Sequence, residues 1–320
     1  MARSALASVP SAPQFSLSGS GGTIFRGVRL YNQTVLQSFT FDNLNQFIFT
    51  VQVMQGGIQL PDESSAISGG VRQGNGDLCV TKLDLSGNIL GHMYLRGFGH
   101  GVQIGSEPEG STTYLWTETA APAKSSGTDT FGTKIARFPF VSGQVLDATA
   151  SSLQVFTPVP GSTSNSCNID IAHGYFLFRY VQSGAHWYSL FDLSDVKAGS
   201  TSSIATMQEP TLPSTFQGYA SFGNYIYALT GEAYAECPPS SSDTGDTYLT
   251  TMDINSGAIV DSFLTGAGKT LEYREPEGMA IQIPDLSNPS QVRLCFGFAS
   301  EESCTVSPKY ATIFYKDSFK

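Results

Sequence analysis

The apolar residues of the chain occur in short runs that are typical of β-strands, and helical periodicity is almost absent. Each run is rich in β-branched and aromatic side chains and is bounded by Gly, Asn, Asp or Ser, which favour turns. Clear examples are residues 47–51, 114–117, 175–178 and 225–229. The pattern predicts an all-β fold built from many short strands.

One strand–turn–strand unit recurs along the chain. It first covers residues 80–90, with the turn at Ser86-Gly87, and it returns at residues 134–146, 188–199 and 248–260. The turn glycines are 56, 56 and 58 residues apart: Gly87, Gly143, Gly199 and Gly257. A period of this length fits a four-stranded propeller blade. Because a single copy cannot bury both faces of its sheet, the copies must stack around an axis. Four turn copies and a terminal remnant predict five blades.

The two ends of the chain are expected to close the ring. The last strand, residues 311–316, lies almost at the C-terminus and needs a partner, for which we expect the N-terminal segment 28–41. This pairing would remove an exposed edge. Residues 1–22 are rich in Ser, Ala, Gly and Pro and predict a mobile tail,. The prediction is therefore a single five-bladed β-propeller over residues 23–320, with four-stranded blades and a ring closed by N- and C-terminal strands.

Composition narrows the partners and the location. The formal net charge of −10 disfavours nucleic acid, whose phosphates an acidic protein repels,. No stretch approaches the roughly 20 apolar residues of a membrane helix. Residues 1–14 contain one Arg and no long apolar core, unlike a standard signal peptide,. We expect a soluble protein, cytoplasmic or released without such a signal, that binds a small molecule or glycan and does not insert into membranes. Its oligomeric state is left open.

The five cysteines include no C-x-x-C pair, so they predict no zinc site,. Cys79 and Cys295 lie in strand-like runs and are expected to be buried thiols. A hairpin disulfide between Cys295 and Cys304 is the alternative in an oxidising compartment.

Five segments that precede the hairpins are expected to be the innermost strands, because each places a polar residue beside Gly, Ala or Val. Small residues suit a narrow axis, and polar ones indicate a water-filled channel. The segments are residues 50–53, 99–103, 168–173, 216–220 and 274–280. The ligand-binding candidates on or beside them are Gln52, Gln103, Trp116, Glu118, Asp170, Gln217 and Arg274.

Three residues are candidates for acid–base chemistry. Glu275 and Glu277 are two positions apart and would share one face of a regular strand,. Paired carboxylates can have separated pKa values and act as acid and base. His100, from another blade, could transfer protons near neutral pH. The same groups could hold a divalent ion or bind a sugar, so no cofactor is predicted and a metal in the channel is left open. We expect His186 to be structural or at the surface.

Several motifs resemble a known family. They are F-G-H-G-V-Q-I-G at residues 98–105, Y-L-W-T-E at 114–118 and R-E-P-E-G-M-A-I at 274–281. Together they are similar to the five-bladed propeller of staphylococcal-type phage receptor-binding proteins and the teichoic acid biosynthesis protein C group, and more distantly to helveticin-type bacteriocins. The resemblance covers roughly residues 25–320. It implies the five-bladed fold and recognition of cell-wall glycopolymers.

Two functions therefore remain open. In a binding module, the channel mouth would hold a glycan or polyol through His100, Gln103, Gln217 and Glu277. In an enzyme, Glu275 or Glu277 would be the acid and His100 its partner. That enzyme would be a glycan hydrolase or lyase, or a cyclase whose aromatic walls shield a cationic intermediate of a small apolar metabolite.

Overall fold

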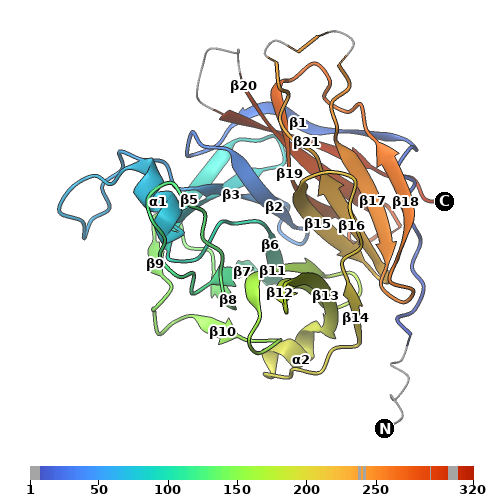
Figure 1. Cartoon of the computed structure of the whole chain (residues 1–320), viewed down its shortest axis with the longest axis horizontal. Helices are drawn as coiled ribbons and strands as arrows, with labels where there is room; N and C mark the ends of the chain where they lie inside the picture. The colour runs from blue at the N-terminus through green and yellow to red at the C-terminus, as the bar shows by residue number, and fades with distance from the viewer. Residues whose placement is uncertain (1–7, 237–238, 241–242, 289, 302–308) are drawn as a thin grey trace.

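Five β-sheets lie around a central region in the computed structural model (Figure 1), which describes residues 8–236, 239–240, 243–288, 290–301 and 309–320. Each sheet contributes one innermost strand, and each innermost strand contacts those of the two neighbouring blades, which completes a ring. The innermost strands, in ring order, are β2 (Leu36–Asp42), β6 (Ile104–Glu109), β11 (Thr163–Asp170), β15 (Phe216–Phe222) and β19 (Glu272–Gln282). The predicted five-bladed propeller is confirmed.

The remaining strands follow outward from each innermost strand. Blade one continues with β3 (Phe47–Val53), β4 (Leu78–Asp84) and β5 (Ile89–Arg96), and blade two with β7 (Thr112–Thr119), β8 (Lys134–Pro139) and β10 (Gln154–Phe156). Blade three adds β12 (Tyr175–Gln182), β13 (Ala185–Asp192) and β14 (Ala205–Gln208), and blade four adds β16 (Tyr225–Thr230), β17 (Tyr248–Asp253) and β18 (Ala258–Leu264). Blade five adds β20 (Arg293–Glu301), β21 (Lys309–Lys316) and β1 (Gly21–Arg29).

Three short elements interrupt this regular plan. Strand β9 (Val145–Asp147) pairs in parallel with β5 and so extends blade one to five strands. Helix α1 (Gly69–Asn75) lies in the long connection between β3 and β4, and helix α2 (Leu193–Lys197) follows β13. Neither helix is long and apolar enough to cross a membrane, and this holds for the whole described part of the chain.

The ring closes through the two ends of the chain, as expected, but with a different N-terminal segment. Strand β1 pairs antiparallel with β21, so that Gly21 lies opposite Lys316 and Arg29 opposite Tyr310. The predicted partner, residues 28–41, overlaps β1 only at its start, and its second half belongs to innermost strand β2. The burial patterns agree with this exchange, because β2 is buried along almost its whole length, whereas Phe25 is the only buried residue of β1, as suits an outer strand.

The N-terminal segment is more ordered than its composition suggested. Phe15 is fully buried, packs against Phe222, Tyr227 and Phe319, and donates its backbone N–H to the Tyr227 hydroxyl at 3.0 Å. Gly21 already begins β1. The expected tail over residues 1–22 is therefore packed against the blades from Val9 onward, with Val9 in the core between blades three and four. Residues 1–7 lie outside the described residues.

The cores between the blades are rich in aromatic residues, and the cysteines take part in them. Cys79, Cys167 and Cys295 are buried free thiols, which confirms the expectation for Cys79 and Cys295. Cys304, the alternative disulfide partner of Cys295, lies outside the described residues.

Candidate functional site

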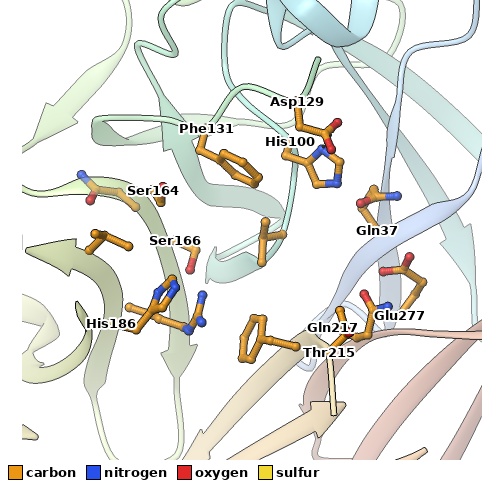
Figure 2. Close-up of a pocket in the computed structure, with 15 residues that line it drawn as sticks. Gln37, His100, Asp129, Phe131, Ser164, Ser166, His186, Thr215, Gln217 and Glu277 are labelled. Atoms are coloured by element: carbon orange, nitrogen blue, oxygen red, sulfur yellow. Dashed lines mark ion pairs between the residues drawn. The ribbon is translucent and has the colours of Figure 1, made fainter. Parts of the chain in front are cut away.

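A pocket lined by many polar residues and several apolar ones lies at the end of the ring where the innermost strands begin (Figure 2). Its volume is about 550 Å³, which lies within the usual range for small-ligand sites,. All five blades contribute to it through their innermost strands or the loops that lead into them. The lining includes Gln37, His100, Asp129, Phe131, Ser164, Asn165, Phe216, Gln217 and Glu277.

The pocket is built by irregularities in the strand pairing. Four innermost strands skip residues in their ladder, between Leu36 and Ser38, Thr163 and Ser166, Phe216 and Gly218, and Pro276 and Met279. Such bulges leave residues unpaired and redirect their side chains. Residues skipped in this way line the pocket: Gln37, Ser164, Asn165, Gln217 and Glu277. The same distortion therefore places polar groups from four blades around one cavity.

The ring narrows to backbone contact beside these bulges. An ideal Cβ on Gly218 would lie 2.6 Å from the Cα of Gly278, and one on Gly278 would lie 2.7 Å from the Cα of Ser38. Gln103, predicted to bind ligand, is fully buried instead. Its amide donates to the Met279 carbonyl at 2.9 Å and accepts from the Tyr219 backbone N–H at 3.4 Å. Gln103 therefore ties blade two to blades four and five.

Glu277 is the group in the pocket whose environment is most unusual. Its side chain lies beside Gln37 and Gln217 (Figure 2) and is only 5% exposed. Its carboxyl makes no hydrogen bond or ion pair with any residue that the structure describes. Burial raises the pKa of Glu277 well above its usual value, and the negative charge of Glu275 raises it further,. Burial therefore favours the protonated form of this carboxyl, which can both donate and accept hydrogen bonds,.

His100 faces the same cavity and is held from behind. Its Nδ1 lies 3.1 Å from Oδ1 of Asp129, and the same oxygen accepts a 2.6 Å hydrogen bond from the Gln73 amide on α1. The hydrogen bond from His100 lowers the pKa of Asp129 to about 2. With Nδ1 engaged by the carboxylate, Nε2 is the ring nitrogen left for a ligand.

Glu118 explains why glycines flank His100. Its buried carboxylate accepts the backbone N–H groups of His100 at 3.1 Å and Gly101 at 2.7 Å, and also that of Gly132. Gly99 and Gly101 have φ angles of 152° and 83°, a region that favours glycine,. Glu118 therefore holds the His100 loop in place and does not itself line the pocket. Burial raises the pKa of Glu118, against the effect of the backbone N–H groups.

Glu275 does not share the pocket with Glu277, which corrects the prediction of a paired face. Tyr273 and Arg274 have left-handed φ angles of 69° and 45°, and the pairing of β19 with β20 is irregular on both sides of Glu275. The two-residue spacing therefore does not imply a common face. Glu275 still acts on the site, because its charge contributes to the raised pKa of Glu277.

Two other predicted ligand residues lie within the blades. Gln52 is on β3, the second strand of its blade, because β2 rather than residues 50–53 is innermost. It hydrogen-bonds the backbone of Asn32 and Thr34. Trp116 is fully buried and donates its indole N–H to Glu107 at 3.0 Å.

Asp170 and Arg274 also do not line the pocket, and their side chains hydrogen-bond other parts of the fold. Asp170 lies at the far end of β11 from the pocket, where it accepts the Gly223 backbone N–H at 2.7 Å. Arg274 is fully buried and donates to the Thr247 hydroxyl and to the backbone carbonyls of Thr265 and Ala267, so it ties β19 of blade five to the ends of the outer strands of blade four. Of the predicted site residues, the structure brings His100, Gln217 and Glu277 together.

Several pocket residues were not expected from the sequence. His186 was expected to have a structural role or to lie at the surface, yet it lines the pocket. Gln37, Asp129 and Phe131 also line the pocket and were not among the predicted site residues. Arg179 also contributes, with its guanidinium 3.7 Å from the ring centre of Phe216 and paired with Glu209 at 2.6 Å. The repeat pattern could have indicated Gln37 if β2 had been assigned as innermost. Asp129 lies in an irregular loop that carries no such signal.

Across the described residues, no group of three or more His, Cys, Asp or Glu side chains is arranged to hold a metal ion.

Comparison with known families agrees with this architecture. Residues 35–297 match the family model described as the phage five-bladed β-propeller receptor-binding platform domain. The chain belongs to this family. The match includes all five innermost strands and therefore the whole ring around the pocket.

Two relatives extend the comparison. A protein of Bacillus subtilis (strain 168) that bears the name teichoic acid biosynthesis protein C is 26% identical over 268 residues, which cover 81% of this chain and 55% of the relative. The tail fiber of Staphylococcus aureus phage P68 shares the fold with a TM-score of 0.64 and 15% identity, over 93% of this chain and 53% of the fiber chain. The chain thus spans about half the length of each relative.

Proposed function

We propose that this propeller recognises a hydroxyl-rich glycan, of the kind found in cell walls, in the pocket around Glu277. The observation that carries the proposal is the buried carboxyl of Glu277, which has no hydrogen-bond partner among the described residues and lies between the side chains of Gln37 and Gln217. Carboxylic acids and amides each offer donors and acceptors, as a sugar hydroxyl requires. Phe131 and Phe216 supply apolar surface for the carbon face of a sugar ring,.

The comparisons support the class of ligand. The family is described by receptor binding, and the named relative of Bacillus subtilis is associated with teichoic acid. The net charge of −10 and the buried acid favour the uncharged, hydroxyl-bearing parts of such a polymer over its anionic groups,.

The test compares two substitutions of Glu277 by titration calorimetry with uncharged cell-wall oligosaccharides. Glu277→Gln keeps a neutral donor and acceptor and should bind like the wild type. Glu277→Met removes both at similar volume and should weaken binding about tenfold, the effect of losing one or two hydrogen bonds. Equal binding by the Met variant, or no binding of any such glycan by the wild type, would refute the proposal.

Acid–base catalysis on a bound glycan is the second candidate, because one pocket holds both a neutral Glu277 and a His100 oriented by Asp129. In a hydrolase, Glu277 would protonate the leaving glycosidic oxygen while His100 takes a proton from the attacking water. Incubation with a bound oligosaccharide and mass spectrometry separates the two functions. Turnover that is lost in Glu277→Gln, with binding retained, identifies an enzyme; an unchanged oligosaccharide identifies a binding module.

A further inference from the structure

A second cavity adjoins the pocket and shares two residues with it. It has a volume of about 360 Å³, and Gln37 and His100 line both cavities. Its remaining wall comes from the segment before β2, from the end of β3 and from α1, with Val35, Val53 and Gly69 among the lining residues. The two shared side chains therefore form the boundary between two adjoining spaces.

The second cavity offers uncommitted amides and no uncompensated charge. The side-chain amides of Gln33 and Gln37 make no hydrogen bond with the described residues. Lys309, the one lysine in the lining, is paired with Glu301 and lies 3.3 Å from the ring centre of Tyr273. These groups suit an uncharged, hydroxyl-bearing unit better than a free anion.

Gln73 links the wall of the second cavity to a residue that lines the first pocket. It lines the second cavity from α1, and its amide donates at 2.6 Å to the Asp129 oxygen that also meets His100. The wall of the second cavity is thereby linked to Asp129, the residue that orients His100 in the first pocket.

We propose that the two cavities form one continuous groove for an oligosaccharide, with a sugar unit in each and with Gln37 and His100 against the linkage between them. This inference rests on the proposed function and adds to it that the ligand is a chain and not a single sugar. It assigns Gln33 and the apolar wall of Val35 and Val53 to a second subsite.

The experiment measures affinity against chain length by titration calorimetry. The probes are uncharged homo-oligomers of N-acetylglucosamine, glucose and galactose, each as monomer, dimer and tetramer. For a series that binds, the tetramer should bind about tenfold more tightly than the monomer, through the added hydrogen bonds and apolar contact of the second subsite.

Two variants locate the gain. Gly69→Leu should fill the second cavity, and its Cβ would come no closer than 3.4 Å to neighbouring atoms, so the backbone can accept it. It should reduce the tetramer to monomer affinity and leave the monomer unchanged. Gln33→Ala removes one free amide and should weaken only the longer chains about threefold. It keeps the test decisive if Gly69→Leu does not fold. Gln208→Ala, an exposed amide on β14 outside both cavities, is the matched control and should change nothing.

The outcomes separate the two proposals. If the monomer and tetramer bind equally and Glu277→Met still weakens binding about tenfold, the second subsite is wrong and the proposed function stands. If Gly69→Leu and Gln33→Ala leave a length-dependent gain intact, the longer chain runs elsewhere and the inference is also wrong. If none of the probes binds the wild type, both proposals are overturned.

Discussion

Two acidic residues of the pocket have opposite electrostatic environments. Asp129 is held ionised by the hydrogen bond from His100, which lowers its pKa to about 2. Glu277 has no such partner in the part of the chain that the structure describes, and burial raises its pKa well above the usual value. A buried carboxyl without a partner reduces stability, and groups with strongly perturbed pKa values concentrate at functional sites. This contrast is the residue-scale argument that Glu277 is kept for a ligand.

The pH dependence of stability tests the state of Glu277. Below the usual pKa of 4.5, the group is protonated in both the folded and unfolded protein and has no effect,. As the pH rises above 4.5, only the unfolded state ionises, so the wild type loses stability until the raised pKa of the folded state is passed. Glu277→Gln removes this loss. It should raise the free energy of unfolding at pH 7, where the unfolded state of the wild type is ionised, and leave it unchanged at pH 4.

Urea unfolding at both pH values measures this difference. The exposed Glu236→Gln should show no gain at either pH and serves as the control. A gain of equal size at pH 4 and pH 7 would show that packing, and not ionisation, separates Glu277 from glutamine.

At the scale of strands, the blades can be predicted from the sequence, but the bulges cannot. The outer hairpins can be predicted because the alternation of apolar and polar residues and the turn glycines are local properties of the sequence. Strand β2 was missed because its sequence, L-Q-S-F-T-F-D, is more polar than that of β3, although both are buried. The bulges that expose Gln37 and Gln217 depend on pairing with a neighbouring strand, which no local pattern records. The strand that holds Glu277 was predicted, but its irregular path, which separates Glu275 from it, was not.

The N-terminal segment gives a prediction at this scale. Composition suggested a tail, yet Phe15 fills a fully buried site among Phe222, Tyr227 and Phe319. Phe15→Ala should therefore lower the free energy of unfolding by about 3 kcal/mol, as large-to-small core substitutions do. Leu44→Ala, at a site that is 48% exposed, should cost less than about 0.5 kcal/mol,. Urea unfolding compares the two variants, and equal small losses would mean that the segment does not dock in solution.

At the scale of the whole molecule, the ring depends on how closely its innermost strands approach. Strand β1 joins the N-terminal part of the chain to the last blade, so that blade has no unpaired edge at β21. At the centre, Gly218, Gly278 and Ser38 bring three blades into backbone contact, and Gln103 bridges blade two to blades four and five. The pocket exists because the bulges that permit this approach also turn polar side chains toward one end of the ring.

Gly278 is the position where this geometry can be tested. An added Cβ would lie 2.7 Å from the Cα of Ser38, and the obstructing atom is backbone that cannot rotate away. Gly110 also has a positive φ, 60° against 73° for Gly278, but no atom lies within 4 Å of its added Cβ. Gly110→Ala should thus cost about 1 kcal/mol for backbone strain alone. Gly278→Ala should cost at least about 2 kcal/mol more, because the blades must separate. Thermal and urea unfolding give both values. If Gly278→Ala lowers the free energy of unfolding no more than Gly110→Ala does, the innermost strands can move apart at little cost. The bulges, rather than close backbone contact, would then determine the shape of the pocket.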